Sequence, residues 1–260
     1  MNPKFDDWIT CPAPNPTARV RLFCLPFAGG GASVFRSWAR ALPPTIETCP
    51  IQLPGRENRL REPAHTDILA LARMLAARIE PYAQRPFAIY GHSMGALLAF
   101  ELARALQQNG AAPPLALFLS AHRAAHLAPR RPPLYDLPDA ELIQALRRLG
   151  GLQEEVIQEQ ELLDILLPTL RADLTLCDLY HYAVGAPLVC PLHLYAGRDD
   201  LEVRPEDMAP WSEHSSRGAS LQVLPGGHFF LRSAADPLLQ SIARAAAQLG
   251  RRDERCLGPV

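Results

Sequence analysis

The pentapeptide Gly91-His92-Ser93-Met94-Gly95 stands between two segments of different character. Residues 87–90 form an apolar run that is typical of a buried strand, whereas residues 96–106 combine helix-forming residues with apolar spacing. A serine at such a strand-to-helix turn adopts a strained backbone conformation, and small residues on either side let the strand and the helix approach each other. The pattern predicts that Ser93 is a nucleophile at the edge of a sheet. The competing interpretation is a tight turn that happens to contain a serine.

Apolar, strand-like runs alternate with helical patterns along most of the chain. Besides residues 87–90, these runs are 20–25, 45–53, 115–119, 192–196 and 221–224. A helical stripe over residues 67–79 begins near Thr66 and Asp67, either of which can cap a helix. Continuous apolar strands separated by helices indicate a mostly parallel sheet with helices on both faces. The predicted fold class is therefore α/β.

One long segment, from about residue 123 to residue 186, interrupts this alternation. It contains no convincing strand, but it has helical patterns at 140–149 and 154–167 after a proline-rich stretch at 129–138. We interpret it as an inserted helical lid over the carboxyl edge of the sheet. Residues 1–260 as a whole are expected to form a single domain, which agrees with the length of the chain.

The overall composition argues against several classes of partner. The chain has 26 basic and 27 acidic residues and a formal net charge of -1, so no overall field attracts nucleic acid or an anionic membrane. No apolar stretch is long enough for a membrane span, and residues 1–10 lack the basic start and apolar run of a signal peptide. We therefore expect a cytoplasmic protein.

The six cysteines are widely spaced, and none belongs to a Cys-x-x-Cys pair. This spacing argues against a zinc site and against a thioredoxin-like motif. In a reducing compartment the cysteines are expected to be free thiols, and no bound metal is expected.

A serine hydroxyl needs a base that removes its proton. His228 follows Pro225-Gly226-Gly227 directly after the last predicted strand, which is where the order serine, acid, histidine places the base. The competing interpretation is an ordinary loop histidine. His92 lies beside Ser93 in the sequence, but its side chain is expected to point away from the hydroxyl and to pack or support the oxyanion loop.

The histidine in turn needs a carboxylate that fixes its tautomer and stabilises the imidazolium. Asp199 and Asp200 follow the predicted strand 192–196 through a short loop. Asp200 is the preferred acid, with Asp199 as the alternative, and both could instead be solvated turn residues. The earlier strand at 115–119 offers no carboxylate before Asp136.

Acyl transfer also requires donors for the negative charge that develops on the substrate carbonyl oxygen. The backbone amide of Met94, directly after the nucleophile, is one expected donor. The second is expected from the glycine-rich loop after the first strand, where the amide of Phe27 or Ala28 is placed best. A phosphate-binding role for this loop is weakly supported, because the loop lacks a P-loop lysine and the Gly-x-Gly-x-x-Gly spacing.

With these residues in view, the chain resembles the type II thioesterases of polyketide and nonribosomal peptide assembly lines, which have the α/β-hydrolase fold. The segments that carry the resemblance are 25–30 (Leu-Pro-Phe-Ala-Gly-Gly), 52–57 (Gln-Leu-Pro-Gly-Arg-Glu), 91–95, 167–173 (Leu-Pro-Thr-Leu-Arg-Ala-Asp) and 226–230 (Gly-Gly-His-Phe-Phe). Segments 53–57 and 170–173 discriminate best, because simple esterases and lipases do not need them. The family's acid falls on Asp200, and Leu201 departs from the proline that is common at its position.

The resemblance implies an enzyme that hydrolyses acyl or aminoacyl thioesters on the phosphopantetheine arms of acyl or peptidyl carrier proteins and so edits stalled or mis-primed synthases. It implies no cofactor of the enzyme's own, because the phosphopantetheine belongs to the partner, and a monomer is expected. Arg56, Arg171 and Asp173 are expected to form structural salt bridges, with organisation of the lid or of the entrance as the alternative.

Three other functions share the same sequence features. A standalone carboxylesterase or lipase would use the same residues, and an acyltransferase would replace water by an alcohol or an amine. A non-catalytic binding protein on this fold is disfavoured, because Ser93, Asp200 and His228 are all present.

Overall fold

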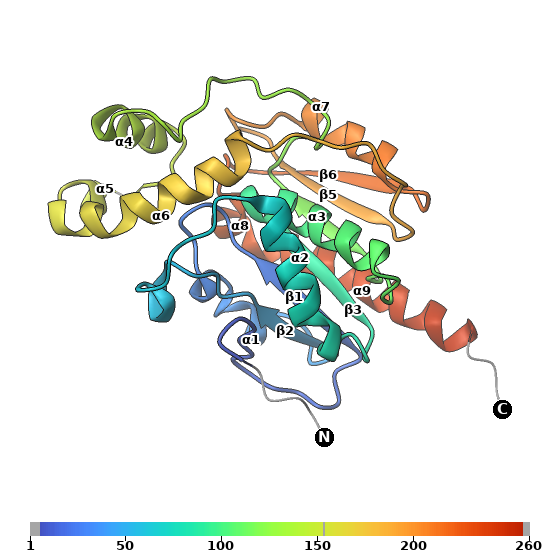
Figure 1. The fold of residues 1–260 in the computed structure, drawn as a ribbon. Coiled ribbons are helices and arrows are strands. Elements are labelled where there is room, and N and C mark those ends of the chain that lie inside the picture. Colours follow the sequence, from blue (N-terminus) through green and yellow to red (C-terminus); the bar gives the residue numbers. More distant parts are fainter. Residues whose placement is uncertain (1–5, 153, 257–260) are drawn as a thin grey trace.

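The computed structural model describes residues 6–152 and 154–256, and its centre is a six-stranded parallel sheet (Figure 1). The spatial order of the strands is β2-β1-β3-β4-β5-β6. Their bounds are β1 Val20–Leu25, β2 Ile46–Pro50, β3 Phe87–His92, β4 Leu117–Ser120, β5 Leu192–Gly197 and β6 Ala219–Leu224. The six strand-like runs of the sequence therefore correspond to the six strands, and the parallel sheet is confirmed.

Helices cover both faces of this sheet. The α-helices of the described residues are α1 Trp38–Ala41, α2 Ile68–Ile79, α3 Met94–Gln108, α4 Asp139–Arg148, α5 Glu154–Ile157, α6 Gln160–Asp178, α7 Pro205–Met208, α8 Phe230–Ser233 and α9 Ala235–Cys256. Helix α2 begins as predicted, because the Asp67 side chain accepts hydrogen bonds from the amides of Leu69 and Ala70. Among the residues described, every helix is too short or too polar to cross a bilayer.

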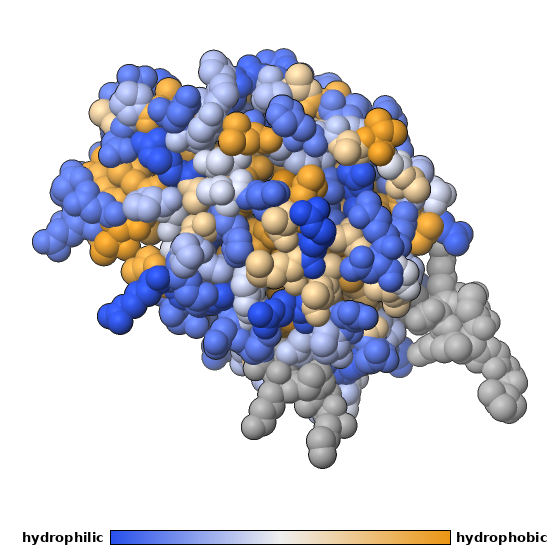
Figure 2. All heavy atoms as spheres, viewed as in Figure 1, coloured by the Kyte–Doolittle hydropathy of each residue, from blue (hydrophilic) through white to orange (hydrophobic). Residues whose placement is uncertain are grey.

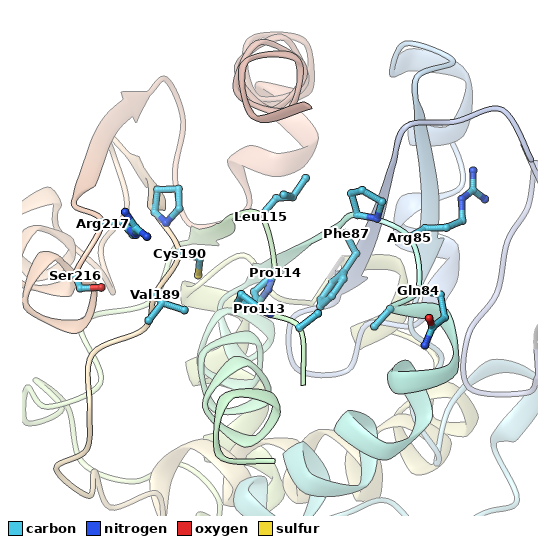
Figure 3. Close-up of a pocket in the computed structure, with 14 residues that line it drawn as sticks. Gln84, Arg85, Phe87, Pro113, Pro114, Leu115, Val189, Cys190, Ser216 and Arg217 are labelled. Carbon is cyan, nitrogen blue, oxygen red and sulfur yellow. The ribbon is translucent and has the colours of Figure 1, made fainter. Parts of the chain in front are cut away.

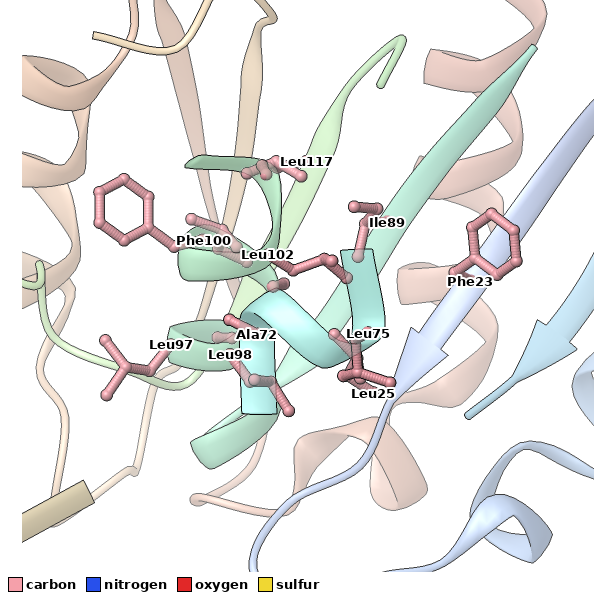
Figure 4. Packing of buried hydrophobic residues seen from close by; sticks show 14 of the residues in the cluster. Phe23, Leu25, Ala72, Leu75, Ile89, Leu97, Leu98, Phe100, Leu102 and Leu117 are labelled. Carbon is pink, nitrogen blue, oxygen red and sulfur yellow. The ribbon is translucent and has the colours of Figure 1, made fainter. Parts of the chain in front are cut away.

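Two apolar layers hold the helices to the sheet. Phe23, Leu25 and Ile89 point to one face and pack with α2 and α3, as Figure 4 shows for Leu75, Leu98 and their neighbours. The alternate strand residues point to the other face and pack with α1 and α9. Because successive side chains of a strand point to opposite faces, a strand that is apolar throughout needs both layers.

Helices α4, α5 and α6 form a separate unit at one end of the molecule (Figure 1). This lid has its own apolar cluster, in which Leu142 and Leu146 of α4 meet Leu163 and Leu167 of α6. Figure 2 shows further apolar side chains over the outer part of α5 and α6, where Leu162 and Ile165 are exposed. The lid helices lie inside the predicted segment 123–186.

The segment before β1 covers the outer edge of the sheet. Ile9 pairs with Ile51 in an antiparallel bridge just beyond the end of β2. The Gln52 amide donates to the carbonyl oxygen of Trp8 at 2.8 Å, and the Thr10 amide donates to that of Pro50 at 2.9 Å. An edge strand presents unpaired backbone groups, so this segment shields β2 from pairing with other chains.

Candidate active site

Ser93 occupies the turn between β3 and α3 in a backbone conformation that side chains rarely adopt. Its φ is 55° and its ψ is -120°. The two flanking glycines are required by contact: a Cβ atom at Gly91 would lie 2.0 Å from the carbonyl oxygen of Gly95, and one at Gly95 would lie 2.2 Å from that of Leu25. The turn therefore has the strained, tightly packed geometry predicted from the pentapeptide.

Three side chains from different strand ends form one hydrogen-bonded chain. The Ser93 hydroxyl lies 2.9 Å from Nε2 of His228, and Nδ1 of the same ring lies 2.9 Å from Oδ2 of Asp200. Ser93 follows β3, Asp200 follows β5 and His228 follows β6. Because the strands are parallel, their carboxyl ends meet at one edge of the sheet, which brings together residues separated by 107 and 28 positions.

The structure places Asp200, and not Asp199, against the histidine. Asp200 is buried, and its Oδ1 atom accepts hydrogen bonds from the amides of Glu202 at 2.8 Å and Val203 at 3.1 Å. Asp199 is exposed and lies 3.3 Å from the amide of Gly226. The two loop amides hold the Asp200 carboxylate in place, and with Nδ1 as the donor to it, Nε2 of His228 is free to accept the serine proton.

The oxyanion loop, residues 27–31, follows β1 at the same edge of the sheet. In the described part of the chain, no group accepts a hydrogen bond from the amide of Phe27 or Ala28. The Gly29 amide, by contrast, donates to Oδ2 of Asp173 at 2.7 Å. Met94 is the first residue of α3, where amides lack a partner inside the helix. The predicted donors Met94, Phe27 and Ala28 therefore remain available for a substrate oxygen.

His92 contributes to the site in a way that the sequence did not reveal. Its Nε2 atom donates to the backbone carbonyl of His228 at 2.8 Å, and its Nδ1 atom lies 3.1 Å from the hydroxyl of Ser120. Its ring is fully buried and packs edge-on against Phe27. Burial lowers the pKa of His92 well below its usual value, so the ring is neutral and holds the backbone of the catalytic loop. The expected packing role is confirmed, but the bond to His228 was missed because the partner is remote in sequence.

The lid is tied to the oxyanion loop through Asp173 of α6. This carboxylate accepts a hydrogen bond from the Gly29 amide and another from Nη2 of Arg56, each at 2.7 Å. Burial raises the pKa of Asp173, although Arg56 and the Gly29 amide act in the opposite direction. Arg171 pairs with Asp139 within the lid. The predicted structural salt bridges are confirmed. Through its hydrogen bond with the Gly29 amide, Asp173 also connects the lid to the loop that carries the expected oxyanion donors.

Two hollows differ in their relation to this site. One of about 260 Å³ lies between the oxyanion loop and the lid, and its walls include Phe27, Leu152, Leu170 and Arg232. Another of about 890 Å³ lies at the amino ends of the strands, and Figure 3 draws Phe87 and Leu115 among the residues that line it. Only the smaller hollow adjoins the loop beside the nucleophile, so it is the better place for an acyl group.

Comparison with known proteins matches the chain to one protein family over most of its length. The model of the thioesterase domain family matches residues 20–246. Gramicidin S biosynthesis protein GrsT of Aneurinibacillus migulanus is 42% identical over 224 residues, which are 86% of this chain and 88% of the relative. Thioesterase PikA5 of Streptomyces venezuelae is 39% identical over 225 residues, which are 86% and 80% of the two chains.

A solved structure is similar over nearly the whole length. The type II thioesterase BorB from the borrelidin biosynthetic cluster has a TM-score of 0.85 and 38% identity, and the match covers 94% of this chain and 99% of that chain. The chain therefore belongs to the thioesterase domain family and is a thioester hydrolase with the α/β-hydrolase fold.

Proposed function

We propose that the enzyme hydrolyses acyl and aminoacyl thioesters on the phosphopantetheine arms of carrier proteins, and so restores stalled or mis-primed synthases. Support comes from the relatives, which carry names from gramicidin S biosynthesis and from the borrelidin cluster. The observation that carries the chemistry is the unbroken hydrogen-bonded chain from Asp200 through His228 to Ser93.

The first half of the reaction forms an acyl-enzyme. The Ser93 hydroxyl attacks the thioester carbonyl while Nε2 of His228 takes its proton, and Asp200 stabilises the imidazolium that results. The charge on the carbonyl oxygen is held by the amide of Met94 and by that of Phe27 or Ala28. The carbon–sulfur bond then breaks, and the carrier thiol leaves after it receives the proton from His228.

The second half regenerates the enzyme. A water molecule enters where the thiol was, His228 removes one of its protons, and the hydroxide attacks the ester carbon. The same amides stabilise the second tetrahedral oxyanion. Cleavage of the ester bond returns the proton to the Ser93 oxygen and releases the free acid. All groups in this scheme are side chains and backbone amides of the chain itself, and the phosphopantetheine stays on the partner.

The hollow beside the oxyanion loop favours substrates with modest acyl groups. Its volume of about 260 Å³ is bounded on one side by the lid residues Leu152, Val156 and Leu170. Because the lid can move relative to the sheet in enzymes of this kind, longer groups are admitted by displacement of α5 and α6. The pantetheine arm is expected to enter beside the lid.

A direct test compares matched substrates. An acetyl group is presented as a thioester on a purified carrier domain, as the thioester of N-acetylcysteamine and as the oxygen ester p-nitrophenyl acetate. We expect the highest kcat/KM on the carrier, no turnover by Ser93→Ala, and release of free acetate. Faster cleavage of the oxygen ester with an untouched carrier would instead identify a carboxylesterase.

The same preparation separates hydrolysis from acyl transfer. Added amines or alcohols should leave the product as the free acid, since water is the expected acceptor. Accumulation of an amide or ester product at the expense of the acid would show that the enzyme is a transferase.

A further inference from the structure

The pairing between the N-terminal segment and β2 places two cysteines opposite each other. In the antiparallel register, Ile9 faces Ile51, so Cys11 faces Cys49 two positions further on. The backbone hydrogen bonds join Gln52 to Trp8 and Thr10 to Pro50. Ile9 and Ile51 lie between these bonds and therefore form a non-hydrogen-bonded pair, the class in which the two side chains come closest. The two classes alternate along an antiparallel pair of strands, so Cys11 and Cys49, two positions further on, fall in the same class.

This class of pair has the backbone spacing that a disulfide needs. Its Cα atoms are about 4.5 Å apart, and disulfides span Cα distances of roughly 4.4 to 6.8 Å. The two sulfur atoms already lie within 4.8 Å of each other. Both cysteines are free thiols in this structure. A bond between them thus needs only side-chain rotation and a small approach.

We propose that Cys11 and Cys49 form a reversible disulfide under oxidising conditions, which staples the N-terminal segment to the edge of the sheet. The oxidant is a low-molecular-weight disulfide such as glutathione disulfide. Nothing in this proposal depends on the hydrolytic function.

The two thiols differ in exposure and in pKa, as the attacking and the resolving cysteine of a thiol–disulfide exchange do. Cys11 is partly exposed, and its contact with the Cys49 side chain lowers the pKa of its thiol. Cys49 is buried, and the same contact together with burial raises the pKa of its thiol well above the usual value. An accessible thiol with a lowered pKa is the first to react with a disulfide in solution.

The exchange proceeds in two balanced steps. The Cys11 thiolate attacks one sulfur of glutathione disulfide, the sulfur–sulfur bond of that molecule breaks, and one glutathione thiolate leaves and takes a proton from water. Cys49 then gives up its proton and attacks the Cys11 sulfur, which expels the second glutathione thiolate. Two protein thiols are oxidised, and one glutathione disulfide is reduced to two glutathione molecules.

A metal ion is the competing occupant, because Glu47 lies within the same 4.8 Å group. The Glu47 carboxylate is already engaged, however. It lies 2.6 Å from Nε of Arg21 and accepts a hydrogen bond from the Asn15 amide at 2.8 Å. Recruiting this carboxylate to a metal would break a buried ion pair, whereas disulfide formation leaves it intact.

The experiment is a peptide map of the whole chain after equilibration with glutathione disulfide, with free thiols blocked before digestion. We expect a peptide pair joined through Cys11 and Cys49, which disappears on reduction. Closure of a loop of about 40 residues should also raise the midpoint of thermal unfolding by roughly 10 °C.

Two variants provide the comparison. Cys11→Ser should lose both the linked peptides and the rise in the unfolding midpoint. Cys177→Ser is the matched control, because Cys177 is also only partly buried but burial raises the pKa of its thiol to about 12. This control should behave like the wild-type chain.

The proposal is overturned if the wild-type chain carries only a glutathione adduct on Cys11, or if Cys11 is joined to a different cysteine. It is also overturned if one equivalent of zinc chloride protects both thiols from alkylation and from glutathione disulfide. The wild-type map decides these points even if Cys11→Ser does not fold.

Discussion

The strained backbone at Ser93 predicts an unusual order of stability among inactive variants. Its φ of 55° with ψ of -120° suits glycine but not a residue with a Cβ atom. Such strain costs about 1 to 3 kcal/mol. Glycine relieves it but loses roughly 0.5 to 1 kcal/mol through the greater freedom of the unfolded chain. The difference between these two ranges is about 0 to 2.5 kcal/mol, so we expect Ser93→Gly to be more stable than Ser93→Ala by about 1 kcal/mol.

Urea unfolding of the two variants, followed by circular dichroism, measures this difference. Both variants lack the hydroxyl, so the bond to His228 is absent from both and does not affect the comparison. Equal slopes of the unfolding free energy against urea concentration would show that the unfolded states are alike. The difference in midpoint then reports the strain.

An exposed helix residue provides the control, because replacement by glycine there should lower the free energy of unfolding instead of raising it. Ala77 is an exposed residue in the last turn of α2, where replacement by glycine costs up to about 1 kcal/mol. Ala77→Gly should therefore lower the stability of the wild-type chain. If Ser93→Gly is less stable than Ser93→Ala by a similar amount, the turn is not strained and the reasoning fails.

Three further predictions address the acid, the packing of the turn and the pH dependence. Asp200→Asn should lower kcat by about 10⁴-fold, because the histidine loses the partner that fixes its tautomer. Asp199→Asn should lower kcat less than tenfold. A larger loss of kcat in Asp199→Asn than in Asp200→Asn would identify Asp199 as the acid. Gly95→Ala should lower kcat/KM by roughly 100-fold, because its Cβ atom would meet the carbonyl oxygen of Leu25 at 2.2 Å and displace the start of the oxyanion loop; unchanged kinetics would contradict this. Burial lowers the pKa of His122 from 6.5, its value in the unfolded chain, to about 3. Between pH 6.5 and 3 the unfolded chain therefore binds a proton that the folded chain does not, and the free energy of unfolding falls as the pH falls through this window. His122→Gln should reduce the slope of unfolding free energy against pH by up to about 1.4 kcal/mol per unit there, and an identical slope in both proteins would count against it.

His92, a neutral histidine at the carboxyl edge of the sheet, helps to hold His228 in place. His92 is buried and neutral, and it holds the His228 backbone through a single hydrogen bond. The side chain of His228 is then oriented from the other direction by Asp200. His228 is therefore fixed at both its backbone and its ring, which leaves Nε2, the nitrogen that faces Ser93, for the proposed proton transfer.

Local sequence patterns were sufficient for the strands, for the start of α2 and for the type of reaction. They did not give the bounds of the lid helices, because the pattern predicted at 154–167 is divided between α5 and α6, and α6 continues to Asp178. The apolar runs fall on the six strands, and Asp67 caps α2, because side-chain periodicity and capping depend on residues that are neighbours in the chain. The glycines around Ser93 likewise report a steric need of one short turn, which is why the nucleophile could be proposed without coordinates.

Tertiary structure alone settled which groups meet. It placed Asp200 rather than Asp199 against His228, and it joined Asp173 to the Gly29 amide across 144 positions. It also brought Cys11 and Cys49 together, whereas their wide spacing in the sequence had argued only against a zinc site and a thioredoxin-like motif. Such contacts depend on strand order, on register and on how the lid packs. No pattern of adjacent residues encodes these properties, because they arise only when distant segments bury their apolar faces together.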